Sequence, residues 1–220
     1  MLQTITSPFL YADVLLAQSE GMAKGERTRA RIMKSTSEIL NETGPLDLRV
    51  TDVCERAGIS NGTFYIYFTD RVGLLEDLLT GFVGFLQDSM REASRQEPEG
   101  PIRAATEAYY ELFRLNRGMM RCLIHHMDSF PGAKQVFHTL NAAWVEAVVS
   151  SVRMRLKRDG SEGAVAPDEL TRRAYALGGM VDQYLSSLFL SEDPGLIAVS
   201  GDREAVLDTL TLIWTRGMAK

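Results

Sequence analysis

Apolar residues recur along this chain at helical spacing, and strand-like alternation persists nowhere. In residues 50–57, for example, they follow at i, i+3, i+4 and i+7, the spacing of one buried helical stripe. The residues of that stripe are Val50, Val53, Cys54 and Ala57. The pattern predicts an all-α fold of about nine helices. These cover residues 26–43, 49–57, 60–68, the stretch from residue 70 to a loop at 96–101, then 102–116, 117–129, 134–158, 168–190 and 203–216.

The second and third of these helices are joined by a very short turn. Gly58 can adopt the left-handed conformation that ends a helix, and Ser60 is a good N-cap for the next one. Phe64 and Phe68 lie four residues apart and give the third helix an inward face. The side chains left on its outer face are Asn61, Thr63, Tyr65 and Tyr67. Two short helices joined by a glycine-containing turn predict a helix-turn-helix.

This stretch resembles the signature of the TetR family, the tetracycline-repressor-like bacterial transcription regulators. The matching residues are Ala57, Gly58, Ile59, Ser60, Gly62, Thr63, Phe64, Tyr65, Phe68, Arg71 and Leu74. The motif covers residues 48–75, and the family's N-terminal helix extends the resemblance back to about residue 24. Beyond residue 90 only the helical layout is compatible. Three positions depart from the usual pattern, because Thr36 replaces Ala, Arg49 replaces a capping Ser or Thr, and Arg71 replaces Lys.

The resemblance implies three parts of the chain. Residues 24–84 would form a three-helix DNA-binding head with its helix-turn-helix at about 49–68, and residues 85–220 a larger helical domain for effector binding and dimerisation. Residues 1–23 would be an extension, either disordered or a partner-binding arm. Met22 is an alternative start to Met1, in which case residues 1–21 would not belong to the natural chain.

The charge of the chain is unevenly distributed. A net charge of -5 argues at first against nucleic acid, but local distribution matters more than the total. Residues 24–71 hold eight basic and seven acidic residues. Five of the basic residues fall within eleven positions at the front of this segment, opposed by Glu26 alone. They predict a phosphate-facing arm, and the alternative is an ordinary solvated helix start.

The resemblance implies a set of DNA contacts on this head. They are Lys24, Arg27, Arg29, Arg49, Thr51, Asn61, Gly62, Thr63, Tyr65, Tyr67 and Arg71. The first residues of a recognition helix reach furthest into the major groove, so Asn61 would bond adenine with its amide or contact phosphate. Arg71 would hold phosphate. Tyr65 and Tyr67 would touch backbone or thymine methyl groups, unless they are core aromatics.

A hydrolase is the main alternative among enzymes. Residues 58–62 read G-x-S-x-G, and Asp128 and His138 follow in hydrolase order. That motif needs a hydrophobic strand before it, whereas residues 52–56 are charged and helical in period. We therefore expect no enzyme.

Metal sites, disulfides and membrane segments have little support in the sequence. Cys54 and Cys122 are too few for a disulfide framework, which indicates a reducing cytoplasm. His125 and His126 are adjacent and would point apart on a helix, so we expect no metal and no other cofactor. No apolar run approaches the length that a membrane span needs, so we expect no membrane association.

The body of the chain offers material for an effector pocket and a dimer interface. Pocket candidates are Tyr109, Tyr110, Phe113, Met120, His125, His126, Met127, Phe130, Phe137, Trp144 and Tyr184. Interface candidates are Leu177, Gly178, Val181, Tyr184, Leu188, Val206, Leu210, Ile213 and Trp214. For both sets the alternative is ordinary packing in the chain's own core.

The family resemblance implies a homodimer that reads a palindromic DNA operator and responds to a small-molecule effector. A ligand-released repressor is the first interpretation. An activator, a ligand-independent regulator and a helical scaffold that does not bind DNA stay open as alternatives.

Overall fold

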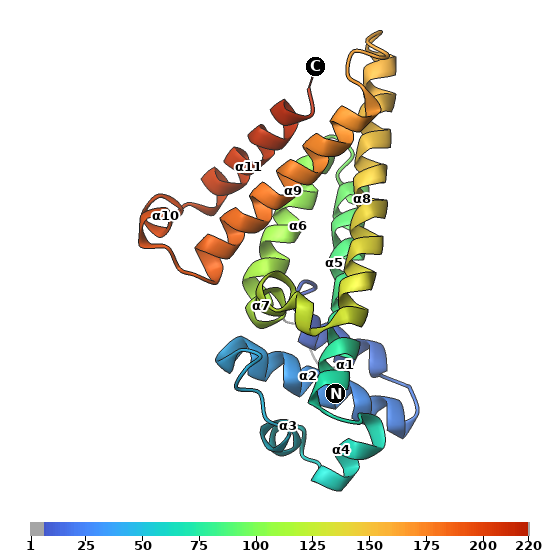
Figure 1. Cartoon of the computed structure of the whole chain (residues 1–220), viewed down its shortest axis with the longest axis vertical. Helices are drawn as coiled ribbons and strands as arrows, with labels where there is room; N and C mark the ends of the chain where they lie inside the picture. Colours follow the sequence, from blue (N-terminus) through green and yellow to red (C-terminus); the bar gives the residue numbers. More distant parts are fainter. Residues whose placement is uncertain (1–6, 220) are drawn as a thin grey trace. The chain divides into compact units, whose positions relative to one another are not determined.

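The computed structural model describes residues 7–219 of the chain, and all regular structure in that range is helical (Figure 1). The α-helices are α1 Tyr11–Ser19, α2 Lys24–Thr43, α3 Val50–Ala57, α4 Asn61–Tyr67, α5 Arg71–Gln96, α6 Pro101–Leu115, α7 Arg117–His125, α8 Pro131–Arg158, α9 Pro167–Phe189, α10 Pro194–Val199 and α11 Arg203–Gly217. A short 3₁₀ helix, η1, covers Met127–Ser129. The predicted all-α fold is confirmed.

All nine predicted helices are present, with ends shifted by a few residues. The predicted helix over 117–129 is divided, because α7 ends at His125 and η1 follows. Two helices were not predicted. One is α10, a short helix in the expected loop at 191–201, where the Asp193 carboxylate accepts a hydrogen bond of 2.9 Å from the Leu196 N–H. The other is α1.

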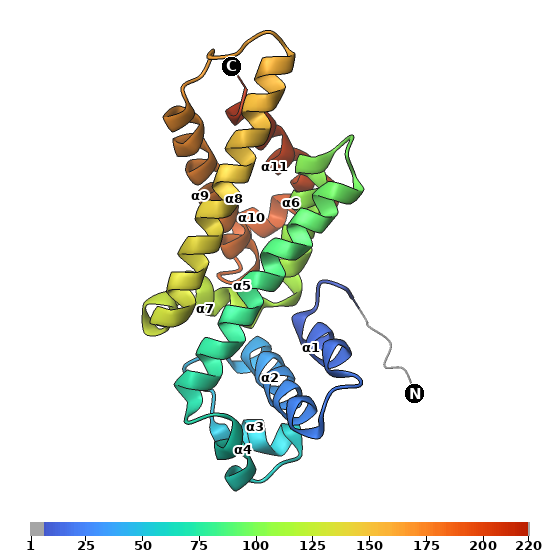
Figure 2. The same cartoon turned by 90° about the vertical axis from the view of Figure 1, so that its right-hand side faces the viewer.

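Helix α1 corrects the expectation of a disordered N-terminal arm for residues 11–19. Tyr11 is buried, and its ring packs against Phe82 and Phe85 of α5 with centroids 5.4 and 5.1 Å apart. The Tyr11 N–H donates a hydrogen bond of 2.9 Å to Asn116 Oδ1, and burial raises the pKa of the Tyr11 phenol to about 12. Figure 2 shows α1 beside α2. Residues 1–6 lie outside the described residues.

The described chain forms two compact units. The first holds residues 7–86 and Glu111–Val136, and the second holds Gln87–Tyr110 and residues 137–219. The divisions fall inside α5, α6 and α8. Residues 111–136, which were assigned to the effector domain, therefore share a compact unit with the helix-turn-helix. The functional boundary at residue 84 stays a prediction.

A very close helix contact holds the first unit together. A Cβ atom added to Gly118, at the start of α7, would lie 2.2 Å from the Leu40 carbonyl carbon of α2. Asn41 reinforces this contact, since its Oδ1 accepts from the Gly118 N–H at 2.8 Å and its Nδ2 donates to the Leu115 carbonyl at 3.2 Å. Only glycine permits this approach of the two backbones.

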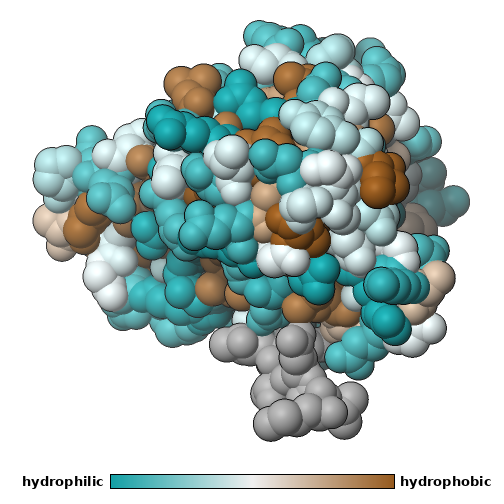
Figure 3. Space-filling view, turned by 90° about the horizontal axis from the view of Figure 1, so that it is seen from below, coloured by the Kyte–Doolittle hydropathy of each residue, from teal (hydrophilic) through white to brown (hydrophobic). Residues whose placement is uncertain are grey.

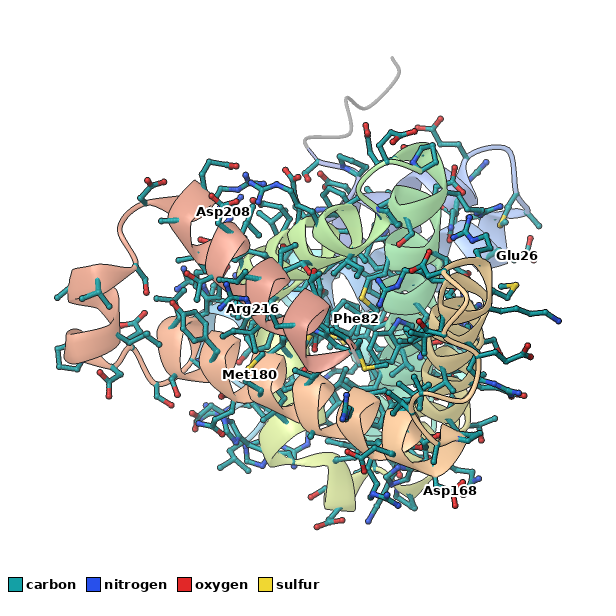
Figure 4. The ribbon with its side chains drawn as sticks, turned by 90° about the horizontal axis from the view of Figure 1, so that it is seen from above. Glu26, Phe82, Asp168, Met180, Asp208 and Arg216 are labelled. Atoms are coloured by element: carbon teal, nitrogen blue, oxygen red, sulfur yellow. The ribbon has the colours of Figure 1, made fainter. Side chains whose placement is uncertain are left out.

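In the second unit, α9 and α11 run antiparallel and side by side (Figure 4). Arg173 of α9 donates to the Ala219 carbonyl at 2.7 Å, whereas Tyr184 meets Ser200 at 2.9 Å near the other end. Trp214 of α11 packs edge-on against Trp144 of α8, with ring centroids 5.5 Å apart. The core of this unit therefore includes contacts of α9 with α11 and of α8 with α11, and Tyr110 of α6 packs on Phe189 of α9 with ring centroids 5.1 Å apart.

We expect the substitution Gly118→Ala to destabilise the protein. The new methyl group has to push apart backbone atoms of α2, which costs about 1–3 kcal/mol of unfolding free energy. Urea unfolding followed by circular dichroism measures this loss.

The matched control is Gly84→Ala, at a helical glycine of α5 where an added Cβ meets no atom within 4 Å. It should be neutral or stabilising by up to about 1 kcal/mol. Equal effects of the two substitutions would contradict the close contact at Gly118.

Candidate nucleic-acid interface

The turn between α3 and α4 has the predicted geometry. Helix α3 buries Val53, Cys54 and Ala57, and it ends at Gly58, which has a φ of +63°. The N–H groups of Gly58 and Ile59 donate to the carbonyls of Glu55 and Cys54 at 3.1 and 3.0 Å. This left-handed termination satisfies the last carbonyls of α3 and redirects the chain within two residues.

Ser60 begins α4 as predicted. Its Oγ accepts a hydrogen bond of 3.1 Å from the Thr63 N–H, and it lies 2.9 Å from the Thr63 hydroxyl. Phe64 is fully buried beneath α4, and Phe68 is buried just after it. The cap and the two rings determine both where α4 begins and which side of it faces outward.

The outward side of α4 combines polar and apolar groups. Asn61 and Gly62 are exposed, Tyr65 is 59% exposed and Ile66 is 77% exposed. Ile66 was missed in the sequence analysis, which considered only polar and aromatic residues there. The outward position of Ile66 could have been predicted from helical spacing, because this residue lies four residues after Gly62 and away from Phe64 and Phe68. Figure 3 shows a mainly hydrophilic surface with separate hydrophobic patches on the side seen from below.

The basic start of α2 lies against α4. A Cβ added to Gly25 would be 3.8 Å from the Tyr67 hydroxyl, so Tyr67 is half-buried against the first turn of α2. Lys24 and Arg27 are exposed in the same turn, and neither has an acidic partner among residues 7–219. Their positive charges are therefore available beside the outer face of α4.

Other basic residues of this segment are engaged inside the head. Arg29 forms an ion pair of 2.7 Å with Asp77, and its guanidinium lies over the Phe68 ring at 5.2 Å from the centroid. Lys34 pairs with Glu38. Arg29 thus supports the packing of α2 on α5, a role that spacing alone did not reveal. A phosphate contact from Arg29 stays a prediction.

Arg71 has a structural role beside its predicted phosphate contact. Its Nη1 donates to the carbonyls of Leu48 and Leu46, at 3.0 and 3.4 Å. These bonds hold the connection between α2 and α3. Arg49 at the end of this connection and Thr51 in the first turn of α3 are exposed. The residue remains exposed overall, so its charge is still presented at the surface.

The eleven pocket candidates do not come together in one compact unit. Phe113, Met120 and residues 125–127 and 130 belong to the first unit, whereas the others belong to the second. Those others are Tyr109, Tyr110, Phe137, Trp144 and Tyr184. A common cavity for the whole set therefore stays a prediction.

The interface candidates need a correction. Six of them are buried within the chain, namely Leu177, Val181, Leu188, Val206, Leu210 and Trp214. Their side chains are covered by the chain itself, so a role for them between subunits stays a prediction. Gly178 and Tyr184 are half-buried, and Ile213 is exposed. The larger apolar side chains of α9 and α11 were selected from the sequence. These side chains lie mostly on the inward face of each helix.

The hydrolase alternative does not fit this geometry. Ser60 follows a helix, and its hydroxyl is engaged in capping α4. Asp128 and His138 belong to different compact units. Within residues 7–219, no three metal-ligating side chains form a group that could hold an ion. In the same range, every helix is too short or too polar for a membrane span.

Comparisons with known proteins also indicate a DNA-binding region in this part of the chain. The family model for bacterial regulatory proteins of the tetR family matches residues 32–78. The HTH-type transcriptional regulator EthR of Mycolicibacterium smegmatis is 25% identical over 195 residues, covering 86% of this chain and 85% of that relative. EthR of Mycobacterium tuberculosis is 26% identical over 210 residues, covering 90% and 94% of the two chains.

Solved structures share the fold. The fatty acid degradation regulator FadR from Bacillus halodurans has a TM-score of 0.65 at 13% identity, covering 84% of this chain and 93% of that one. FadR from Bacillus subtilis, solved in complex with stearoyl-CoA, has a TM-score of 0.63 at 12% identity, covering 85% and 97%.

The fold and the outward face of α4 define a helix-turn-helix DNA-binding protein. The chain belongs to the TetR family of transcriptional regulators, as the signature in residues 57–74 predicted. It is a regulator and not an enzyme.

We expect Arg71→Ala to lower the unfolding free energy by about 1 kcal/mol, because two carbonyls lose a charged donor at a partly exposed site. Urea unfolding in the absence of DNA measures this change. Arg49→Ala is the control, since Arg49 is also an exposed arginine of the head and has no side-chain partner among residues 7–219. If both variants unfold like the unaltered protein, Arg71 does not hold the connection between α2 and α3.

Proposed function

We propose that this protein is a homodimeric repressor that binds a palindromic DNA operator and is released by a small-molecule effector. The observation that carries the DNA-binding part is the anchored helix α4, with Phe64 and Phe68 buried and Asn61, Tyr65 and Ile66 outward. We place this activity in the bacterial cytoplasm, on the chromosome.

In this proposal α4 enters the major groove. Asn61 at its N-terminal end bonds the edge of adenine, which an amide can grip with two hydrogen bonds. Tyr65 and Ile66 contact backbone or thymine methyl groups. Lys24, Arg27, Arg49 and Arg71 contribute phosphate contacts, which give binding a steep dependence on salt.

The second subunit is proposed to pack on the outward sides of α9 and α11. These sides carry small and apolar residues, Ala176 on α9 and Leu212 and Ile213 on α11. Small residues permit close helix approach, and exposed Leu and Ile gain from burial. The proposed interface therefore replaces the six buried candidates by their outward neighbours. A symmetric pair would hold two heads about one DNA turn, roughly 34 Å, apart or somewhat more.

Release by an effector requires that the ligand binds the two states of the dimer with different affinity. We propose that an occupied pocket changes the separation of the two heads through the long helix α5. The relative solved with stearoyl-CoA supports a small-molecule effector as the class of ligand. An activator and a ligand-independent regulator remain the alternatives within the same fold.

Selection of bound sequences from random duplexes tests the DNA contacts. Asn61→Ala should relax the preference at one base pair per half-site, because a paired amide contact discriminates by about 1–3 kcal/mol. Arg27→Ala should weaken all sequences alike and lower the salt slope by about 1. Affinities come from fluorescence anisotropy at several salt concentrations.

The control for loss of charge is Lys157→Ala, at an exposed residue of α8 outside the head. It should change neither the preference nor the salt slope. A protein that selects no sequence and shows no salt dependence would favour the scaffold alternative instead.

Dimerisation is tested by Ile213→Asp, which places a charge at a position that is 39% exposed on α11. Sedimentation should shift from dimer to monomer, and affinity for a palindromic duplex should fall on the order of tenfold or more as bivalent contact is lost. Ile197→Asp, at a position 45% exposed on α10, is the matched control and should leave the dimer intact. A dimer that persists after the substitution on α11 and dissociates after the substitution on α10 would place the interface elsewhere.

A further inference from the structure

A carboxylate without a positive partner lies inside the second unit. Asp182 of α9 accepts a hydrogen bond of 2.5 Å from the Tyr109 hydroxyl of α6. Within the described residues no Lys, Arg or His comes within ion-pair distance of Asp182. Burial raises the pKa of the Asp182 carboxyl, and the hydrogen bond from Tyr109 opposes that rise. Asp182 is only partly exposed, and a negative charge that is partly withdrawn from water is stabilised when a cation pairs with it.

Asp182 lines a small hollow between α8 and α9. The other lining residues are Asn141, Trp144, Val145, Ala174, Tyr175, Gly178 and Gly179. The cavity has a volume of about 40 Å³, far below the roughly 300–1,000 Å³ of pockets for drug-sized ligands. It therefore fits a ligand head group rather than a large molecule.

The walls of the hollow suit a positive head group. Trp144 and Tyr175 contribute aromatic side chains, and a cation within about 6 Å of such a ring face is attracted by its electrons. A Cβ added to Gly179 would meet no atom within 4 Å, so a ligand can approach the α9 backbone closely at this position. The Asn141 amide also lines the hollow, and it has no hydrogen-bond partner among residues 7–219.

We propose that this hollow binds the ammonium or amidinium group of a small organic cation, with Asp182 as its counter-ion and Trp144 and Tyr175 as aromatic walls. Asn141 supplies a further oxygen to an N–H of the ligand. Tyr109 positions the carboxylate through its hydrogen bond. The inference rests on the proposed function in one respect, because it assigns a chemical class to the effector of the regulator.

The competing explanation is that the hollow binds a neutral ligand. Binding of a neutral ligand would depend differently on the charge of Asp182. A neutral group could donate a hydrogen bond to the carboxylate but would form no ion pair with it, and aromatic walls alone would accept an uncharged ring equally well. A matched pair of probes with the same shape and different charge therefore separates the two explanations.

The experiment uses the full chain and ¹⁹F NMR line broadening of 4-fluorobenzylammonium and 4-fluorobenzyl alcohol at neutral pH. We expect the cation to bind at least about tenfold more tightly than the alcohol, because only the cation pairs with Asp182. Asp182→Asn should remove this preference. Asp168→Asn, at an exposed acid in the first turn of the same helix, is the control and should retain it.

Tyr175→Ala provides a second variant whose folding is not in question, because Tyr175 is 47% exposed. It should weaken binding of the cation several-fold and leave the melting temperature within the range of the control. Equal binding of cation and alcohol by the unaltered protein, or a preference for the cation that survives in the Asp182 variant, would overturn the proposal.

A separate titration distinguishes this inference from the proposed function. The selected duplex is titrated with protein in the presence and absence of 4-fluorobenzylammonium. Binding of the cation that depends on Asp182 supports the site whether or not the duplex is released. If the cation binds in this way but the protein binds no duplex at all, the site stands and the regulator proposal fails.

Discussion

Two aromatic rings buried beneath α4 determine what this helix can present to a partner. Phe64 and Phe68 lie with their ring centroids 5.8 Å apart, and both are shielded from solvent. Exposing either ring would cost about 1.5–3 kcal/mol, so α4 cannot turn about its axis without a large loss. The Ser60 cap fixes its first turn as well. The outward placement of Asn61 and Ile66 depends on this anchoring.

The local distribution of charge matters more than the net charge of the chain. The structure shows which positive side chains are free of acidic partners among the described residues. An acidic chain can present a basic surface when positive residues gather at one place, as Lys24 and Arg27 do beside α4. Arg29 and Lys34 contribute less than their sequence positions suggest, because Asp77 and Glu38 neutralise them. The reverse situation occurs at Asp182, a negative group that residues 7–219 leave without a positive partner.

Local signals in the sequence predicted the head well. Gly58, Ser60 and the Phe64–Phe68 spacing act over a few residues, and each determines local structure through backbone geometry, capping or burial. Long-range contacts were not predictable in this way. Helix α1 is stabilised by Tyr11 packing on α5, and the inward face of α9 depends on how α11 lies against it. The link between Tyr109 and Asp182 joins residues 73 positions apart, a separation at which periodicity carries no information.

The central claim is that the outward face of α4 contacts DNA, and site-specific photocrosslinking tests it most directly. A benzophenone amino acid is placed at Ile66 of α4 or at Ile197 of α10, both exposed positions, and the protein is irradiated with a labelled duplex that it has selected. The account predicts crosslinks to DNA from position 66 and none above background from position 197. Crosslinks from position 197 with none from position 66 would contradict it.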